Sequence, residues 1–174
     1  RARLAMGFSR VAIKLDQPET ALAVLKEALQ KEPQNIALLQ ALADAYLENG
    51  LAQDAYDIAS KVIEQQPVEI DTVNWFVIFG SQLRKHPGTV QTLVQSDMIR
   101  LLHNAVRTAP ARVDLMVQLG KLLLEKGERQ PAVDVFRKLS EMEVKDWQID
   151  AIDLYQAGKT IREWGDAALS VFLL

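Results

Sequence analysis

The chain has no cysteine, two histidines and no long apolar run. Without cysteine, disulfides, thiolate nucleophiles and cysteine-based zinc sites are excluded. No apolar run approaches the roughly 18 residues of a membrane helix, so we expect no direct membrane insertion of this segment. The net charge is −3 over 174 residues. Because that balance provides no basic surface for a phosphate backbone, we also expect no nucleic-acid partner.

Groups that could carry catalysis are few and dispersed. His86 precedes Pro87 and Gly88 in a turn pattern, and His103 lies within a helical pattern. Acidic pairs occur near helix termini, where capping and the helix dipole explain them: Glu141 with Glu143, and Asp150 with Asp153. The sequence contains no metal-binding, phosphate-loop or nucleophile motif. We therefore predict a protein that is not an enzyme and has no catalytic, cofactor or metal site.

The sequence does contain an internal repeat. Pro33 and Pro67 lie 34 residues apart, as do Ala21 and Ala55. A fixed period of 34 residues that ends in proline predicts one helical hairpin used repeatedly. Such hairpins bury their apolar faces by stacking on one another, so the period predicts an all-α fold. Asp16 is a candidate N-cap of the helix that starts near Pro18.

The unit from Ile36 to Glu69 carries the clearest pattern. Its bulky, small and turn-forming residues stand at Leu39, Leu42, Ala43, Tyr46, Gly50, Ala55 and Pro67. In this pattern the chain resembles the tetratricopeptide repeat family. The resemblance implies a right-handed superhelical solenoid of about five antiparallel hairpins. Pentatricopeptide repeats fit less well because they bind RNA through a basic inner face, and HEAT repeats are longer.

We predict one repeat array over residues 1–174, with repeats at 2–35, 36–69, 72–110, 113–146 and 151–174, the last incomplete. The third repeat is irregular, because Pro67 and Pro110 lie 43 residues apart. With Phe79 and Gly80 as its Leu-Gly pair, we expect three extra residues before its first helix and a long second helix over about 89–108. Ending on apolar residues 171–174, the chain is expected to be an excerpt of a longer protein.

In the tetratricopeptide repeat family, the first helix of each hairpin lines the concave groove. The resemblance places there Met6, Arg10, Ile13, Gln40, Asp44, Leu47, Val77, Ser81, Arg84, Val117, Lys121, Leu124, Tyr155, Lys159 and Arg162. The candidate partner-binding residues among them are Arg10, Gln40, Asp44, Ser81, Arg84, Val117, Lys121, Tyr155, Lys159 and Arg162. The tryptophans, Trp75, Trp147 and Trp164, are expected in the core.

These features predict a non-catalytic scaffold that binds a peptide or protein segment in its groove. The alternative is a docking or regulatory arm of a larger enzyme or of a bacterial envelope export or assembly machine. Basic residues in the last three repeats favour an acidic partner, and the apolar residues 171–174 favour self-association through that end. Cytoplasm and periplasm are both compatible with the sequence, whose many glutamines suggest a bacterial origin.

Overall fold

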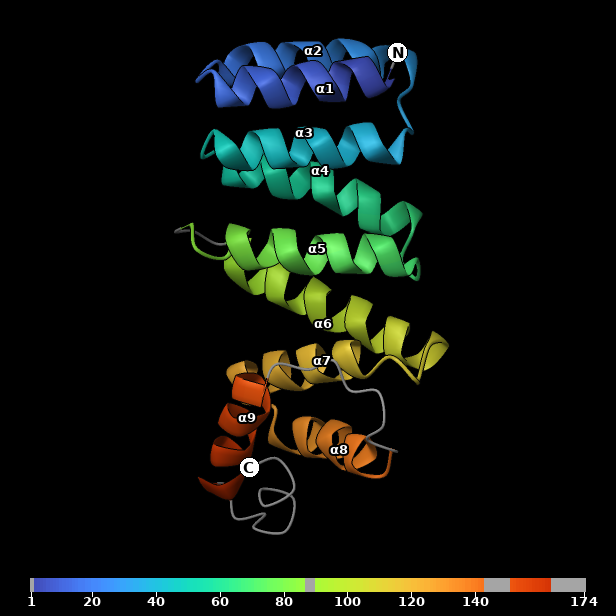
Figure 1. The fold of residues 1–174 in the computed structure, drawn as a ribbon, viewed down its shortest axis with the longest axis vertical. Helices are drawn as coiled ribbons and strands as arrows, with labels where there is room; N and C mark the ends of the chain where they lie inside the picture. Colours follow the sequence, from blue (N-terminus) through green and yellow to red (C-terminus); the bar gives the residue numbers. More distant parts are fainter. Residues whose placement is uncertain (1, 87–89, 143–150, 164–174) are drawn as a thin grey trace. The chain divides into compact units, whose positions relative to one another are not determined.

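The computed structural model describes residues 2–86, 90–142 and 151–163, and the helices in these ranges are drawn in Figure 1. They are α1 (Ala2–Lys14), α2 (Pro18–Lys31), α3 (Ile36–Glu48), α4 (Ala52–Gln65), α5 (Ile70–Leu83), α6 (Val90–Thr108), α7 (Val113–Lys126), α8 (Arg129–Ser140) and α9 (Ala151–Glu163). The described residues contain no strand, which confirms the all-α helical-repeat fold. Among these helices, none combines the length and apolar character needed to cross a membrane.

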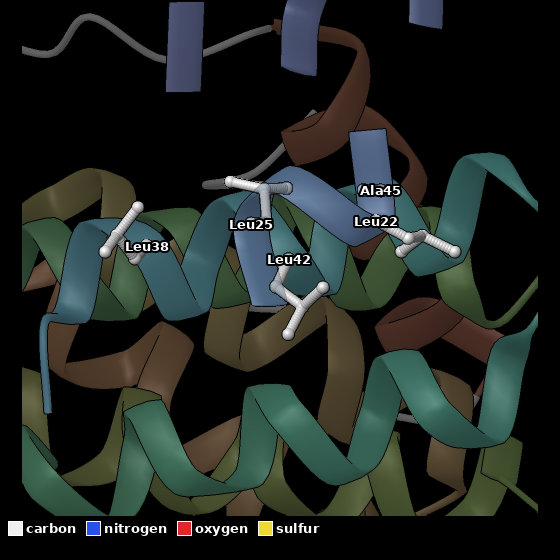
Figure 2. Packing of buried hydrophobic residues seen from close by; sticks show 5 residues of the cluster. All are labelled: Leu22, Leu25, Leu38, Leu42 and Ala45. Atoms are coloured by element: carbon white, nitrogen blue, oxygen red, sulfur yellow. The ribbon is translucent and has the colours of Figure 1, made fainter. Parts of the chain in front are cut away.

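The chain divides into two compact units, residues 1–96 and 97–174, which we describe separately. In the first unit, α1 packs on α2 and α3 packs on α4, as the hairpin pattern predicts. The hairpins join where α2 meets α3, and Figure 2 shows the side chains that fill this contact. They are Leu22, Leu25, Leu38, Leu42 and Ala45, each at most 9% exposed. Stacking of this kind buries the apolar stripe that a single hairpin leaves open.

The third repeat begins one period after the second. Helix α3 starts at Ile36 and α5 at Ile70, so the expectation of three extra residues before α5 is wrong. The residues that correspond to Leu42 and Ala43 are therefore Phe76 and Val77, not Phe79 and Gly80. Both pairs lie on the buried face of α5, since they are three residues apart. Glycine at the second pair favoured the wrong register.

The extra length of the third repeat follows α5. Helix α6 spans Val90–Thr108, has 19 residues, and confirms the predicted long helix over about 89–108. The connection from Leu83 to Val90 is also longer than the one from Glu48 to Ala52. Near the start of α6, the Gln91 side-chain amide donates to the carbonyl oxygens of Arg84, at 2.9 Å, and His86, at 3.1 Å.

Helices α1, α3 and α7 end in left-handed backbone at equivalent positions. Gly50 has φ +72° and Gly127 has φ +79°, and Asp16, 34 residues before Gly50, has φ +59°. Asp16 thus terminates α1, and the prediction that it caps α2 is wrong. The N-cap of α2 is Gln17, which makes no side-chain capping bond, and Pro18 follows in the first turn. An aspartate tolerates this backbone better than most residues, but glycine fits it without strain.

In the second unit, α7 packs on α8 and also contacts α9. Leu119 and Phe136 are buried, and Gly120 lies directly under the Phe136 ring. The small residue that the repeat pattern places at this crossing is therefore present. Several expectations fall outside the described residues: those on Trp147, Trp164 and residues 171–174, and those on the acidic residues Glu143 and Asp150.

Candidate functional site

The first unit contains a pocket of about 460 Å³ formed by α1, α3 and α5. These are the first helices of three successive repeats, which the tetratricopeptide resemblance places on the inner face. The pocket is lined by Arg10, Ile13, Lys14, Asp44, Leu47, Glu48, Trp75, Ile78, Phe79 and Gln82. It mixes cationic, anionic and apolar groups, a combination suited to a polypeptide segment.

The lining follows the repeat period. Arg10, Asp44 and Ile78 occupy one position in three consecutive repeats, spaced by 34 residues. A second row, one helical turn further along, contains Lys14, Glu48 and Gln82. In each row a cation on α1 is followed by an anion on α3 and an uncharged residue on α5. Stacking of repeats therefore builds the pocket. The different residues at equivalent positions of successive repeats place cations on one side of it and anions beside them.

Aromatic side chains of α5 form the apolar wall. The Trp75 and Phe79 rings stack with centroids 5.0 Å apart, and Phe76 is tilted against both. Ile78 projects beside them with 64% of its surface exposed. The indole Nε1 of Trp75 is buried, and its hydrogen bonding to the Asp44 carboxylate lowers the pKa of that group.

Asp44 is the most perturbed acid of this pocket. Removal of water by the pocket walls raises the pKa of Asp44 to about 6, and the nearby Glu48 adds to this. The Trp75 indole and the Arg10 guanidinium act in the opposite direction. Asp44 is nevertheless an exposed residue that lines the pocket. Because the carboxylate is weakly solvated on one side, a donor on a bound segment could interact with it strongly.

The sequence-predicted groove residues of the first unit separate into two groups. Arg10, Ile13, Asp44 and Leu47 lie together in the pocket. Gln40, Ser81 and Arg84 do not line it, and Val77 is buried. The Ser81 hydroxyl donates to the Val77 carbonyl at 2.7 Å within α5. Met6 packs against the buried cluster between α2 and α3.

Sequence reasoning missed the α5 residues that do line the pocket, Trp75, Ile78 and Gln82, together with Lys14 and Glu48. For α5 the cause is the wrong register. The strict 34-residue period would have found Ile78 from Asp44 and Gln82 from Glu48. Trp75 was expected in the core, and it is half-buried at the boundary between core and pocket.

In the second unit the candidate residues vary in exposure. Val117 is buried at 3%, whereas Tyr155 is 56% exposed. Lys159 and Arg162 are exposed on α9, and Lys121 is half-buried with a side-chain interaction of its own. A partner-binding role for these residues stays a prediction. Within the described ranges, no three acidic or histidine side chains are placed to hold a metal ion.

Comparison with known proteins identifies the class of fold. Residues 12–71 match the family model of the tetratricopeptide repeat. The fold is also similar to "MamA 41-end from Desulfovibrio magneticus RS-1", at 17% identity, 99% coverage of this chain, 90% of that chain, and a TM-score of 0.66. No curated protein sequence gives a significant match.

Two further solved structures are tetratricopeptide repeat proteins by their descriptions. YrrB, "a TPR protein with an unusual peptide-binding site", shares 18% identity over 99% of this chain and 82% of that chain, with a TM-score of 0.63. TTC0263 from Thermus thermophilus shares 16% identity over 99% and 88%, with a TM-score of 0.53. Residues 12–71 thus match the tetratricopeptide repeat model, and the fold of the chain is similar to that of tetratricopeptide repeat proteins.

Proposed function

We propose that this chain is a non-catalytic scaffold that binds a peptide segment of another protein in the pocket between α1, α3 and α5. The observation that carries this proposal is an exposed apolar side chain, Ile78, in a pocket that also holds the Trp75 ring and the charged Arg10 and Asp44 side chains. An exposed isoleucine that lines a pocket is unfavourable in the free protein. A bound segment would cover it.

The lining indicates the chemistry of that segment. Ile13, Leu47 and Ile78 would contact an apolar side chain. Arg10 on α1 and Asp44 on α3 would orient its polar groups. Aromatic and arginine contacts of this kind carry much of the energy of protein interfaces. One of the similar structures, YrrB, is described as a tetratricopeptide protein with a peptide-binding site.

The experiment is selection of peptides from a random display library against the chain, followed by affinity measurement. Ile78→Glu should weaken a selected peptide at least about tenfold, because it removes the apolar contact and adds a further carboxylate to a pocket that already holds Asp44 and Glu48. The matched control is Leu93→Ser, which changes another exposed apolar residue, 51% exposed, that does not line the pocket. If Ile78→Glu leaves the affinity of every selected peptide unchanged, the pocket is not the binding site.

A second surface is retained from the sequence as part of this proposal. Tyr155, Lys159 and Arg162 are exposed on α9 at helical spacing, which favours an acidic segment of the partner there. Changing Lys159 and Arg162 together to Glu should lower the affinity for an acidic peptide and remove its salt dependence. We further propose that residues 1–174 act as one repeat array, whether as an independent scaffold or as the docking arm of a larger protein.

A further inference from the structure

The pocket between α1, α3 and α5 carries two rows of exposed residues in which the charge changes in the same order. The rows are Arg10, Asp44, Ile78 and Lys14, Glu48, Gln82. Each row runs from a cation on α1 through an anion on α3 to an uncharged residue on α5. Because the two rows have the same order, their charges add to one another. The pocket therefore presents a fixed order of charge along the direction in which the repeats stack.

The cations and anions of the pocket lie on different helices and are open to a ligand. Among the described residues that line it, α1 contributes no anion, and α3 and α5 contribute no cation. Within the described part of the chain, no ion pair involves Arg10, Lys14, Asp44 or Glu48. Each of these four residues is exposed. A bound segment can therefore reach both signs of charge.

The Asp44 carboxylate lacks full compensation for the water that it has lost. Burial and repulsion by Glu48 raise the pKa of Asp44, and these effects outweigh the opposing effects of the Trp75 indole and the Arg10 guanidinium. A further cation beside Asp44 would therefore stabilise its charged form. The middle of the pocket, at α3, is thus suited to a basic group of the ligand.

The spacing of the helices matches an extended chain. Helices α1 and α3 are in contact, and α1, α3 and α5 follow one another along the first unit (Figure 1). Packed helices lie about 8–10 Å apart. A segment in the polyproline II conformation has about three residues per turn and rises about 3.1 Å per residue, so it returns a side chain to the same side about every 9 Å. Such a segment can present one side chain to each successive first helix.

We infer that the pocket selects an extended segment with a carboxylate opposite α1, a basic group opposite α3 and an apolar group opposite α5, about three residues apart. This inference rests on the proposed function and names the class of segment bound. Arg10 and Lys14 would hold the carboxylate, Asp44 and Glu48 the basic group, and Ile78 the apolar group. A segment with its acidic and basic residues exchanged would place like charges together in both rows, so the pocket would discriminate against it.

The test uses fluorescently labelled peptides of one composition. The matched peptide has glutamate, arginine and leucine in this order, each three residues apart, with alanine and proline between them. In the exchanged peptide, arginine and glutamate trade places. Both are also made in reverse order, because the order of charge leaves the direction of the bound chain open. The better matched peptide should bind at least about tenfold more tightly than either exchanged peptide in low salt, and this preference should shrink as salt rises.

A charge-exchange variant tests whether these residues set the preference. Arg10→Glu and Lys14→Glu together with Asp44→Lys and Glu48→Lys should make the chain prefer the exchanged peptides. The four side chains are exposed and the net charge is unchanged, so the helicity and melting temperature, measured alongside, should stay near those of the parent.

The matched control exchanges two charges outside the pocket. Lys61→Glu with Glu64→Lys changes exposed residues of α4 that do not line the pocket, and it also leaves the net charge unchanged. This variant should keep the preference of the parent for the matched peptide.

A milder variant and the pH give a second readout. The charged groups around Asp44 are Glu48 on α3 and Arg10 and Lys14 on α1, and α5 contributes no titratable group to the pocket. Asp44 has a pKa of about 6, so it loses the charge that would hold the arginine as the pH falls from 7 to 5. The preference should shrink over this range. Asp44→Asn should show the smaller preference at both pH values.

The outcomes separate this inference from the proposed function. Equal binding of matched and exchanged peptides, with both weakened by Ile78→Glu, would overturn the order of charge and leave the pocket as the binding site. A preference that survives charge exchange, or binding of none of these peptides, would also overturn the inference. Peptides from the display library that Ile78→Glu weakens would then still support the proposed function. Binding that Ile78→Glu leaves unchanged would count against both, because the site would lie elsewhere.

Discussion

Gly120 of α7 lies directly beneath the ring of Phe136 on α8, where a Cβ would fall 2.5 Å from the ring Cζ. Phe136 is fully buried, so its ring cannot move into solvent. Gly120→Ala should therefore force the two helices apart and destabilise the fold by about 1–3 kcal/mol. This exceeds the gain in helix propensity of about 1 kcal/mol that alanine brings. Urea denaturation of the variant measures the difference.

The control for that prediction is Gly7→Ala in α1. Nothing lies within 4 Å of a Cβ at Gly7, so only the propensity gain applies. Gly7→Ala should stabilise the chain by up to about 1 kcal/mol. If both variants shift the urea midpoint in the same direction, close packing under Phe136 does not determine the effect at Gly120.

The left-handed backbone at Asp16 predicts a stabilising substitution. With φ +59°, Asp16 occupies the position that Gly50 and Gly127 fill in other repeats. Asp16→Gly should stabilise the first hairpin by about 0.5 kcal/mol, because the relief of strain exceeds the added freedom of the unfolded chain. Gly50→Ala should destabilise by about 1 kcal/mol for the opposite reason. Thermal melting of both variants tests the pair, and a destabilising Asp16→Gly would contradict the equivalence of the three turns.

Close packing inside the second hairpin can be tested at two alanines of α4. Ala55 is 0% exposed, whereas Ala52, one turn earlier, is half-buried. Ala55→Leu should overpack the contact with α3 and cost about 1–3 kcal/mol. Ala52→Leu should be nearly neutral. Equal shifts in the denaturation midpoint would mean that α4 is rotated relative to this account.

The raised pKa of Asp44 predicts how stability changes with pH. Its pKa is about 6 in the folded chain, compared with 3.8 for the free side chain, so the folded state binds the proton more tightly. The contribution of Asp44 to stability therefore falls as the pH rises from about 4 to about 6. Asp44→Asn should remove that decline and give a more stable protein at pH 7. Urea denaturation of both proteins between pH 4 and 7 measures the difference, and identical pH profiles would contradict it.

Asp114 contributes to stability with the opposite pH dependence to Asp44, so it serves as the comparison for the Asp44 experiment. Arg112 donates to both carboxylate oxygens of Asp114, at 2.8 and 2.6 Å, and lowers the pKa of Asp114. The stability that this pair provides is present above the ordinary aspartate pKa and is lost as the pH falls below it. Asp114→Asn should therefore weaken the protein at neutral pH, where Asp44→Asn strengthens it.

Sequence periodicity predicted most of the fold, because spacing alone determines which helical face is buried. The 34-residue period located the hairpins, and Leu119 with Gly120 gave the correct register for α7. Glycine misled the assignment in α5, where the buried face contains two equally suitable pairs, Phe76 with Val77 and Phe79 with Gly80. Local pattern cannot distinguish such pairs, and only the observed helix start at Ile70 does.

The candidate site was predicted only in part, because some of its residues depend on the register of α5. Arg10 and Asp44 followed from the repeat pattern, but Ile78 did not, because it depends on the register of α5. The stripe of Leu4, Phe8 and Val11 on α1 has the pattern of a buried face, and its sequence resembles that of Leu38, Leu42 and Ala45. Whether a helix covers such a face is a property of tertiary packing, so the sequence could not show that the α1 stripe is exposed.

The most direct test of the account is the indole N–H resonance of Trp75 in a ¹⁵N-labelled chain titrated with a selected peptide. The Trp75→Phe variant assigns the resonance, because the signal that disappears in this variant belongs to Trp75 and not to Trp147 or Trp164. Because Trp75 lines the pocket and its indole N–H lies beside Asp44, the account predicts that this resonance shifts as a bound peptide changes the surroundings of the indole. A peptide that binds tightly while this resonance stays unchanged would contradict the proposed binding site.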